Sequence, residues 1–427
     1  MKKILIFKLK IFAKLILLRQ KPLVIGITGS IGKSSTKEAL ALILGKKFKV
    51  RATYKNYNNE IGLPLTIIGA KSPGKNILSW FSVFFLAFKI IIFGDKSYPE
   101  VLILEMGIDR PGDLKYLCSL ARPKIGIVTS VSYAHIEYFG SLLEIKREKE
   151  VLIKSLQAQG TAILNFDNEF CKEMAEVSRV KVISYGFKEG VDLLAQDIKY
   201  NFDKGDYELS GINFKFNFRG SIVPVLMKNA LSPGAVYAAL AASACALELG
   251  LNLVDIANYL KNFSLPKGRM NVLPGINNSF IIDDSYNSSP EACLAALDVL
   301  GSIKIESEAK KYVVLGDMLE IGSYTEEGHR LVGEKVAKIE ADFLITIGDR
   351  SLITRESALK NGLDNDQLFH FNDNDEIGKF LISRINSGDI ILVKGSQGMR
   401  LERVVKEIMA EKDRAAELLV RQGGSWK

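Results

Sequence analysis

A glycine-rich stretch near the start of the chain, GITGSIGKSS (Gly26–Ser35), carries residue types suited to binding phosphate. Its glycines stand at positions 26, 29 and 32, so it misses the common pattern G-x-x-x-x-G-K-[ST] by one position. Gly29 and Gly32 still permit tight turns and a close approach of backbone amides to an anion. Lys33 can neutralise phosphate oxygens, and the Ser34 hydroxyl can reach a magnesium ion. The alternative is an ordinary strand–helix turn with a surface lysine.

Three side chains later in the chain could act beside such a loop. Glu105 ends the apolar run VLILE, and an acid at the tip of a buried strand can hold magnesium. His135 follows the run IGIVTS and is one of only three histidines, with a structural role as the alternative. Lys149 lies in the charged stretch EIKREKEVL, where a solvated helix face with i,i+4 ion pairs is the simplest interpretation.

The stretch IIDDSYNSSP puts polar side chains at the end of another predicted strand. Asp283 and Asp284 could bind ribose hydroxyls or support a cation, and Asn287 follows closely. The alternative is that this segment begins a helix, capped by Ser288 or Ser289.

A further strand end, LVKGSQGMR, offers Lys394 and Ser396, which suit an anionic carboxylate. A surface turn is the alternative. In open α/β sheets ligands collect at the carboxyl ends of the strands, so all of these endings are candidate site positions.

Apolar runs of strand length alternate with helical segments along most of the chain. They include PLVIGI, EVLILEM, KIGIVTSV, GTAILNF and VKVISYG, and later SFIIDDS, KYVVLGD, DFLITIGD and DIILVKGS. This alternation predicts an α/β protein whose central domain has a mostly parallel sheet with helices on both faces. Residues 192–228 alternate and contain turn residues, which indicates a small antiparallel patch. An alanine-rich helix is expected at AVYAALAASACALELG.

The segment 263–275, FSLPKGRMNVLPG, is rich in proline and glycine and is the predicted domain boundary. We therefore expect a basic apolar helix over 1–21, a P-loop ATP-binding domain over 22–265 and a C-terminal Rossmann-like α/β domain over 266–427.

The composition excludes some functions. With 47% hydrophobic and 25% charged residues the chain is a folded globular protein. The net charge is +8, but residues 1–21 hold seven Lys and Arg and no acid, leaving 50 basic against 49 acidic residues elsewhere. Such a distribution argues against a nucleic-acid partner. The four cysteines form no C-x-x-C pair, so each is expected to be a small buried side chain in a reducing cytoplasm.

Two apolar segments bear on location. The N-terminal one is broken by Lys8, Lys10 and Lys14 and has no signal-peptide cleavage site. It suits either an anionic membrane surface or packing on the next domain. The second, residues 77–93, is interrupted by Lys89 and predicts a packed or membrane-surface helix rather than a span. Together they could form one apolar docking patch, so we expect a cytoplasmic protein with peripheral contact at the inner face of the plasma membrane through 1–20 and 77–93.

Taken together the motifs resemble the Mur ligase family, the ATP-dependent amide-bond formers of peptidoglycan synthesis. The resemblance covers about residues 22–410 and rests on GITGSIGKSS, NYNNEIGLPLT, LEMGIDRPGDL, AHIEYFGS, DDSYNSSP, VVLGDMLEIG and LVKGSQGM, in family order. It is greatest to the branch that adds D-alanyl-D-alanine to a UDP-muramyl tripeptide through an acyl phosphate. The family loop has the shorter form T-G-x-x-G-K-[ST], which Thr28–Ser34 fits.

The resemblance implies ATP and Mg²⁺ as cofactors and assigns roles to particular residues. It implies nucleotide contacts from Thr28, Gly29, Ser30, Ile31, Gly32, Lys33, Ser34, Ser35, Arg269, Asp283 and Asn287. It implies a metal site at Ser34, Glu105, His135 and Lys149, with Lys149 matching a lysine that the family often carbamylates. It implies substrate contacts, to the UDP-muramyl peptide or the D-alanyl-D-alanine, from Asn56, Asn58, Asn59, Asp284, Lys394 and Ser396.

Two departures from the family pattern leave questions open. The family normally has an N-terminal domain that binds the UDP-sugar, whereas only residues 1–25 precede the loop here, so a partner could supply that surface. Gly234, Ala235 and Ala238 stand where an adenine-side motif is expected. The alternatives are another ligase of the superfamily, such as a folylpolyglutamate synthase, or a membrane-associated ATP-binding subunit without ligase turnover.

Overall fold

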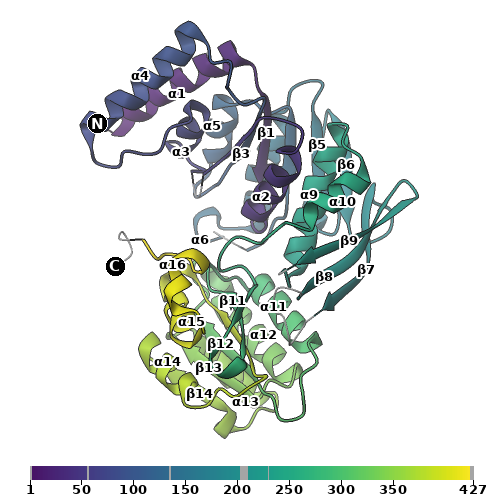
Figure 1. Cartoon of the computed structure of the whole chain (residues 1–427), viewed down its shortest axis with the longest axis vertical. Helices are drawn as coiled ribbons and strands as arrows, with labels where there is room; N and C mark the ends of the chain where they lie inside the picture. Colours follow the sequence, from purple (N-terminus) through teal and green to yellow (C-terminus); the bar gives the residue numbers. More distant parts are fainter. Residues whose placement is uncertain (1, 55–56, 134–135, 202–209, 229, 424–427) are drawn as a thin grey trace.

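The computed structural model describes residues 2–54, 57–133, 136–201, 210–228 and 230–423. Two α/β units lie one above the other in Figure 1, each built around its own sheet. This confirms the predicted α/β class, with a mostly parallel sheet followed by a second, parallel-dominated one.

The first sheet has nine strands in the order β2-β3-β1-β4-β5-β6-β7-β8-β9. Their bounds are β1 Leu23–Thr28, β2 Val50–Ala52, β3 Val101–Glu105, β4 Ile125–Val128, β5 Thr161–Asn165, β6 Lys181–Gly186, β7 Leu193–Asn201, β8 Gly211–Phe218 and β9 Ser221–Lys228. Neighbours from β2 to β7 pair parallel, and β7, β8 and β9 pair antiparallel, as the alternating segment predicted.

The position of β1 explains where a ligand can bind. β1 lies between β3 and β4, and the chain leaves it into α2 (Lys33–Leu44), whereas the segment after β4 leads to α6 (Ile136–Phe139) and α7 (Leu142–Lys154). α2 packs with α9 (Pro233–Glu248) and α10 (Leu253–Leu260), and α7 packs with α5 (Asp113–Leu120). The helices that follow β1 and β4 thus lie on opposite faces of the sheet, an arrangement at which ligands of open α/β sheets bind beside the carboxyl ends of the strands.

The second sheet has six strands in the order β10-β11-β15-β12-β13-β14, of which only the β10–β11 pair is antiparallel. The strands are β10 Asn271–Pro274, β11 Phe280–Asp284, β12 Lys311–Gly316, β13 Phe343–Ile347, β14 Leu368–Phe371 and β15 Ile390–Lys394. The helices are α11 Pro290–Ser302, α12 Thr325–Lys338, α13 Ser351–Lys360, α14 Asn374–Ile382, α15 Glu402–Ile408 and α16 Ala415–Leu418. β10 lies inside the segment predicted to be a linker. It forms a strand by pairing with β11, and a short run that contains a proline does not predict that pairing.

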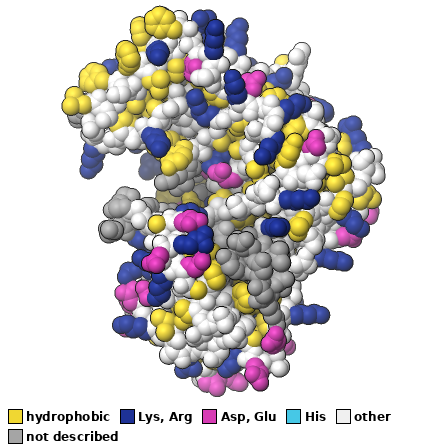
Figure 2. Space-filling model, viewed as in Figure 1, with side chains coloured by type: hydrophobic (Ala, Val, Ile, Leu, Met, Phe, Trp, Pro, Cys, Tyr) yellow, Lys and Arg dark blue, Asp and Glu magenta, His cyan; other side chains and the backbone are white. Residues whose placement is uncertain are grey.

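Helices α1 (Lys2–Gln20) and α4 (Ile77–Phe93) lie side by side at the upper left of Figure 1, next to α3 (Gly62–Ile68). Figure 2 shows hydrophobic side chains interspersed with Lys and Arg over this corner. α1 buries Leu9, Ala13 and Ile16, so it packs on the first unit while part of its apolar surface stays exposed. In the part of the chain that the structure describes, no helix is both long and apolar enough to cross a membrane.

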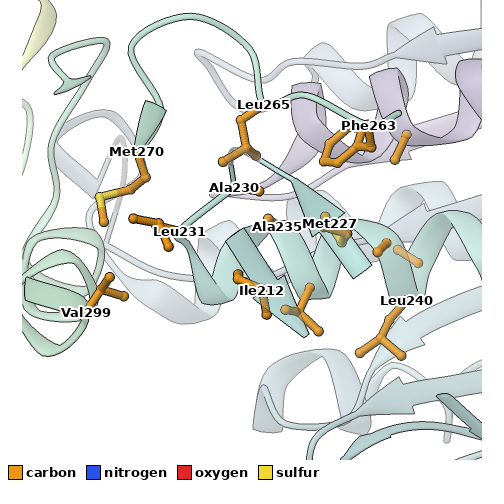
Figure 3. Close-up of a cluster of buried hydrophobic side chains, with 14 of the residues drawn as sticks. Ile212, Met227, Ala230, Leu231, Ala235, Leu240, Phe263, Leu265, Met270 and Val299 are labelled. Carbon is orange, nitrogen blue, oxygen red and sulfur yellow. The ribbon is translucent and has the colours of Figure 1, made fainter. Parts of the chain in front are cut away.

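Apolar side chains join the two units. Figure 3 shows Leu231, ahead of α9, and Met270 gathered with Val299 of α11, and all three are buried. Tyr133, after β4, stacks on Tyr324 of the second unit with ring centroids 4.1 Å apart. Cys118, Cys171, Cys245 and Cys293 are all buried, as expected of small core side chains.

Candidate active site

The glycine loop lies between β1 and α2 and needs its glycines. Gly29 has φ 147° and Gly32 has φ 90°, in the region that side chains rarely adopt. A Cβ added to Gly29 would lie 1.9 Å from Thr129 Oγ1, so only glycine fits there. Thr28 is fully buried and its hydroxyl donates to the Met106 carbonyl at 2.9 Å, which ties the loop to the end of β3.

Residues after β4 hold the loop from the other side. Ser132 N donates to Ser30 Oγ at 3.0 Å, and Ile31 N donates to Ser130 Oγ at 3.0 Å. Thr129 Oγ1 donates to the Ile31 carbonyl at 2.5 Å. These hydrogen bonds set the loop conformation before any ligand binds, which reduces the entropy lost on binding.

Glu105 lies beside the loop because β3 pairs with β1, with Ile27 opposite Glu105. Only 3% of Glu105 is exposed. Its Oε1 accepts from Ser34 Oγ at 3.3 Å and from Asn58 Nδ2 at 3.2 Å. Its Oε2 accepts no hydrogen bond from the described residues, although Lys37 Nζ lies 3.7 Å away. A buried carboxylate oxygen without a donor, next to a serine hydroxyl, fits a cation such as Mg²⁺.

Two lysines near the loop have lowered pKa values. Lys33 Nζ donates to the Gly29 carbonyl at 2.6 Å, and burial lowers its pKa, with Glu105 opposing and Arg269 adding to that shift. Lys149 on α7 is only 1% exposed, which contradicts the solvated-face interpretation. Burial, and then repulsion from Lys33, lower the pKa of Lys149 well below its ordinary value. The neutral amine is therefore favoured at this position.

The ends of β11 and β15 meet in the second sheet, with Asp284 opposite Lys394. Lys394 Nζ donates to Asp284 Oδ2 at 2.6 Å and to the Asn287 carbonyl at 3.0 Å, and both side chains are buried. Ser396 Oγ accepts from Leu319 N at 2.8 Å. Lys394, Asp284 and the Asn287 carbonyl are thus joined in one buried group, whereas Ser396 bonds separately to backbone groups of Leu319 and Ser288.

Asp283 differs from its neighbour because it is fully buried and lines neither cavity described below. Its Oδ1 accepts from Ser285 N at 3.1 Å, and burial raises the pKa of this carboxyl to about 6. Ser289 caps α11 by accepting from Ala292 N, as the helix-capping alternative predicted.

Two cavities lie where the units meet. The first is about 330 Å³ and is lined by Gly32, Ser35, Gly234, Ala238, Arg269, Asp284, Asn287 and Lys394, among others. The second is about 390 Å³ and is lined by Ser30, Lys33, Ser34, Asn58, Glu105, Arg269 and Ser396, among others. Arg269 lies over the Tyr286 ring at 4.4 Å and borders both cavities. Predicted residues from both units are thus brought together.

Other predicted residues lie elsewhere. Asn59 is outside both cavities and accepts hydrogen bonds from Ile61 N and Gly62 N, so it shapes a local turn. Lys149 and Ala235 also line neither cavity. Asn56 and His135 fall outside the residues that the structure describes.

The first cavity also has lining residues that were not predicted: Asn165, Asp167, Asn168 and Tyr237. Tyr237 donates to Asp167 Oδ2 at 2.9 Å and stacks on Phe187 with ring centroids 4.1 Å apart. A signal was present, because the run NFDN follows the carboxyl end of β5.

Comparison with known proteins agrees with this arrangement. Residues 27–78 and 89–244 match the Mur ligase middle domain, and residues 268–397 match the domain described as Mur ligase, glutamate ligase domain. The UDP-N-acetylmuramoyl-tripeptide–D-alanyl-D-alanine ligase of Bacillus subtilis is 28% identical over 386 residues, 90% of this chain and 76% of that protein. The ligase of the same name from Synechocystis is 30% identical over 389 residues, which are 91% of this chain and 75% of that protein.

A solved structure extends the likeness to three dimensions. The MurF ligase of Thermotoga maritima, determined in complex with ADP, superposes with a TM-score of 0.77 at 27% identity, covering 96% of this chain and 84% of that one. The matched domains, the identity to a full-length relative and the shared architecture lead to one conclusion: this chain belongs to the Mur ligase family.

Proposed function

We propose that this protein is an ATP-dependent, ADP-forming amide ligase of peptidoglycan precursor synthesis that adds D-alanyl-D-alanine to a UDP-N-acetylmuramoyl tripeptide. The observation that carries the proposal is the second cavity, where Lys33, Ser34 and Glu105 from one unit face Ser396 from the other. The proposal is supported by the two relatives named for that activity and by the ADP complex of the Thermotoga protein.

The residues present fit a nucleotide with its magnesium ion. We propose that the loop from Thr28 to Ser35 takes the phosphates and that Ser34 and Glu105 hold Mg²⁺. His135 and Lys149 complete the proposed metal site, Lys149 as a carbamate. Arg269 and Asn287 are the proposed nucleotide contacts from the second unit, whereas Asp283, which was also expected to contact the nucleotide, is fully buried and lines neither cavity.

Chemistry at the substrate follows from these charges. Bound ATP with Mg²⁺ supplies the phosphoryl group that converts the tripeptide carboxylate into an acyl phosphate. Lys33 neutralises charge on the phosphoryl oxygens. ADP is the leaving group of that first step. The dipeptide amine then attacks the acyl carbon, the bond from this carbon to the phosphate oxygen breaks, the amine loses a proton to the solvent or the departing phosphate, and an amide bond results. Because the cavity lies between two units, closure of the units on the substrates would exclude water that hydrolyses the acyl phosphate.

The substrate contacts complete the proposal. We assign Asn56, Asn58 and Asn59 to the side of the muramyl peptide, and Asp284, Lys394 and Ser396 to the second unit's side of the site. Residues 1–21, 22–265 and 266–427 remain the proposed domains. We also propose a cytoplasmic protein that makes peripheral contact with the inner face of the plasma membrane through 1–20 and 77–93, with a partner assisting UDP-sugar binding.

The test is ADP release by the purified full chain with ATP, Mg²⁺, UDP-N-acetylmuramoyl tripeptide and D-alanyl-D-alanine. We expect release only with both substrates, together with a pentapeptide product seen by mass spectrometry. Release with a folate and glutamate instead would favour the folylpolyglutamate synthase alternative. ATP binding without turnover on any acceptor would refute the ligase and leave the binding subunit.

A further inference from the structure

Two helices of the first unit carry apolar stripes on their outer surface. On α1 the stripe consists of Ile4, Phe7, Ile11, Leu15 and Leu18. On α4 it consists of Leu78, Phe81, Phe85, Phe88 and Ile92. These ten side chains are 41–79% exposed. Within each helix they recur every three or four residues, so each set lies on one side of its helix.

The two stripes belong to one surface, which we call the docking face. Phe12 of α1 packs against Phe84 of α4 with ring centroids 5.4 Å apart, so the helices lie side by side. Their inner sides are anchored in the core, for example by Ala13 and Ala87. Figure 2 shows the apolar side chains gathered at this corner of the molecule. A fixed pair of helices thus presents apolar area away from the protein.

The charged side chains on the two helices of the docking face have a single sign. Residues 1–21 contain seven Lys and Arg, residues 61–94 contain three Lys, and neither stretch contains an Asp or Glu. Lys8, Lys14 and Lys89 are exposed on the same two helices. Acidic residues lie near the helix ends, at Glu60, which pairs with Lys2, and at Asp95, which follows α4. Aromatic and aliphatic side chains on two helices whose own charged residues are all Lys or Arg match an anionic lipid surface, where the apolar groups enter the acyl boundary and the cationic groups meet phosphates.

We infer that the docking face binds an anionic lipid bilayer, with α1 and α4 both lying in the plane of the membrane surface. The inference deepens the peripheral contact proposed above by naming its residues and its lipid class. It also bears on the site: Lys2 at the start of α1 pairs with Glu60 at 3.2 Å, in the segment that carries Asn58. The docking face therefore contacts the segment that leads to the second cavity.

The test is co-sedimentation of the full chain with vesicles of phosphatidylcholine alone or mixed with phosphatidylglycerol. We expect binding to the anionic vesicles, weakened about tenfold or more by neutral lipid or high salt. The double variant Phe81→Glu/Phe85→Glu should lose about tenfold or more of this binding. The matched control Ile222→Glu/Val254→Glu changes two exposed apolar residues far from the docking face in sequence and should bind like wild type.

Other occupants of the face give different results. No binding of the wild type to any vesicle, or equal binding by Phe81→Glu/Phe85→Glu, overturns the inference. So does light scattering that shows a dimer converted to a monomer by that variant, because the face would then join two copies. ADP release with soluble substrates, measured on every variant, separates this inference from the ligase proposal: retained release with lost vesicle binding supports docking, and vesicle binding without release leaves docking intact while the ligase proposal fails.

Discussion

The carboxyl ends of the strands in the two sheets, which we call the first edge and the second edge, differ in how their buried charges are paired. At the first, Glu105 has an oxygen without a donor among the described residues, and Lys33 and Lys149 have lowered pKa values. At the second, Lys394 pairs with Asp284, and Glu402 accepts from Arg421 at 2.8 Å and from Arg400 at 2.7 Å. At the second edge Asp283 Oδ2 also has no hydrogen-bond donor among the described residues, but the charged pairs beside it are complete. Because an incompletely paired buried charge is costly unless a ligand completes it, the first edge suits ligand charge, whereas most charges at the second edge stabilise one another.

The strongest test of the first edge is Lys33→Ala. We expect ADP release to fall about a thousandfold, because phosphoryl charge loses its neutralising group inside a water-poor site. The free energy of unfolding should hardly change, since the hydrogen bonds of Lys33 among the described residues go to its own loop carbonyls. Lys360→Ala, at an exposed helix end, is the matched control and should keep full activity. A large fall in the free energy of unfolding of Lys33→Ala would show that Lys33 stabilises the fold, as the paired charges of the second edge do, and would contradict the comparison.

Lys394→Ala tests the second edge. It leaves the Asp284 carboxylate buried without its partner, so the free energy of unfolding should fall by about 4 kcal/mol in urea titrations. The double variant Lys394→Met/Asp284→Leu should recover most of that loss. Arg330→Ala breaks an exposed pair with Glu334 and should cost no more than about 0.5 kcal/mol. An equal fall in the free energy of unfolding on breaking the Lys394–Asp284 and Arg330–Glu334 pairs would show that burial does not determine how much a pair contributes.

Asp283 should make the free energy of unfolding depend on pH. Its carboxyl ionises near pH 4 when unfolded, but its pKa is about 6 when folded. Between these values the folded state keeps a proton that the unfolded state has lost, so the free energy of unfolding should fall by about 2 kcal/mol as pH rises from 4 to 6, out of about 3 kcal/mol over the whole titration. Asp283→Asn should remove this contribution, whereas Asp349→Asn, at an exposed position, should not.

Lys149 sharpens the role of the first edge. Because its pKa is lowered, its amine is neutral at a lower pH than an ordinary lysine, and only a neutral amine forms a carbamate with carbon dioxide. Activity should therefore rise with pH through that pKa, and carbon-13-labelled bicarbonate should give a carbamate NMR signal. Lys149→Gln should lose both that signal and about a hundredfold in ADP release. A fully active Lys149→Gln enzyme would contradict the carbamate and show that Lys149 has only a structural role.

Much of the fold was predictable because local patterns report local structure. The apolar runs of β1, β3, β4, β5, β6, β11, β12, β13 and β15 were all recognisable, since buried parallel strands read as continuous apolar segments. The short strands β2, β10 and β14 were missed, and β10 forms only through its tertiary pairing with β11. At the site, the glycine loop and Glu105 were visible as a turn between a strand and a helix and as a strand ending.

What the sequence determined by itself was therefore the order of strands and helices, the phosphate-binding loop and the single sign of charge near the N-terminus. The tertiary structure decided which charges are buried. The stretch EIKREKEVL reads as solvated, yet packing of α7 buries Lys149. The tertiary structure also brought Lys394 to Asp284, 110 residues earlier in the chain, and decided which sides of α1 and α4 stay exposed. Burial and long-range pairing depend on which elements pack together, and local spacing does not specify that.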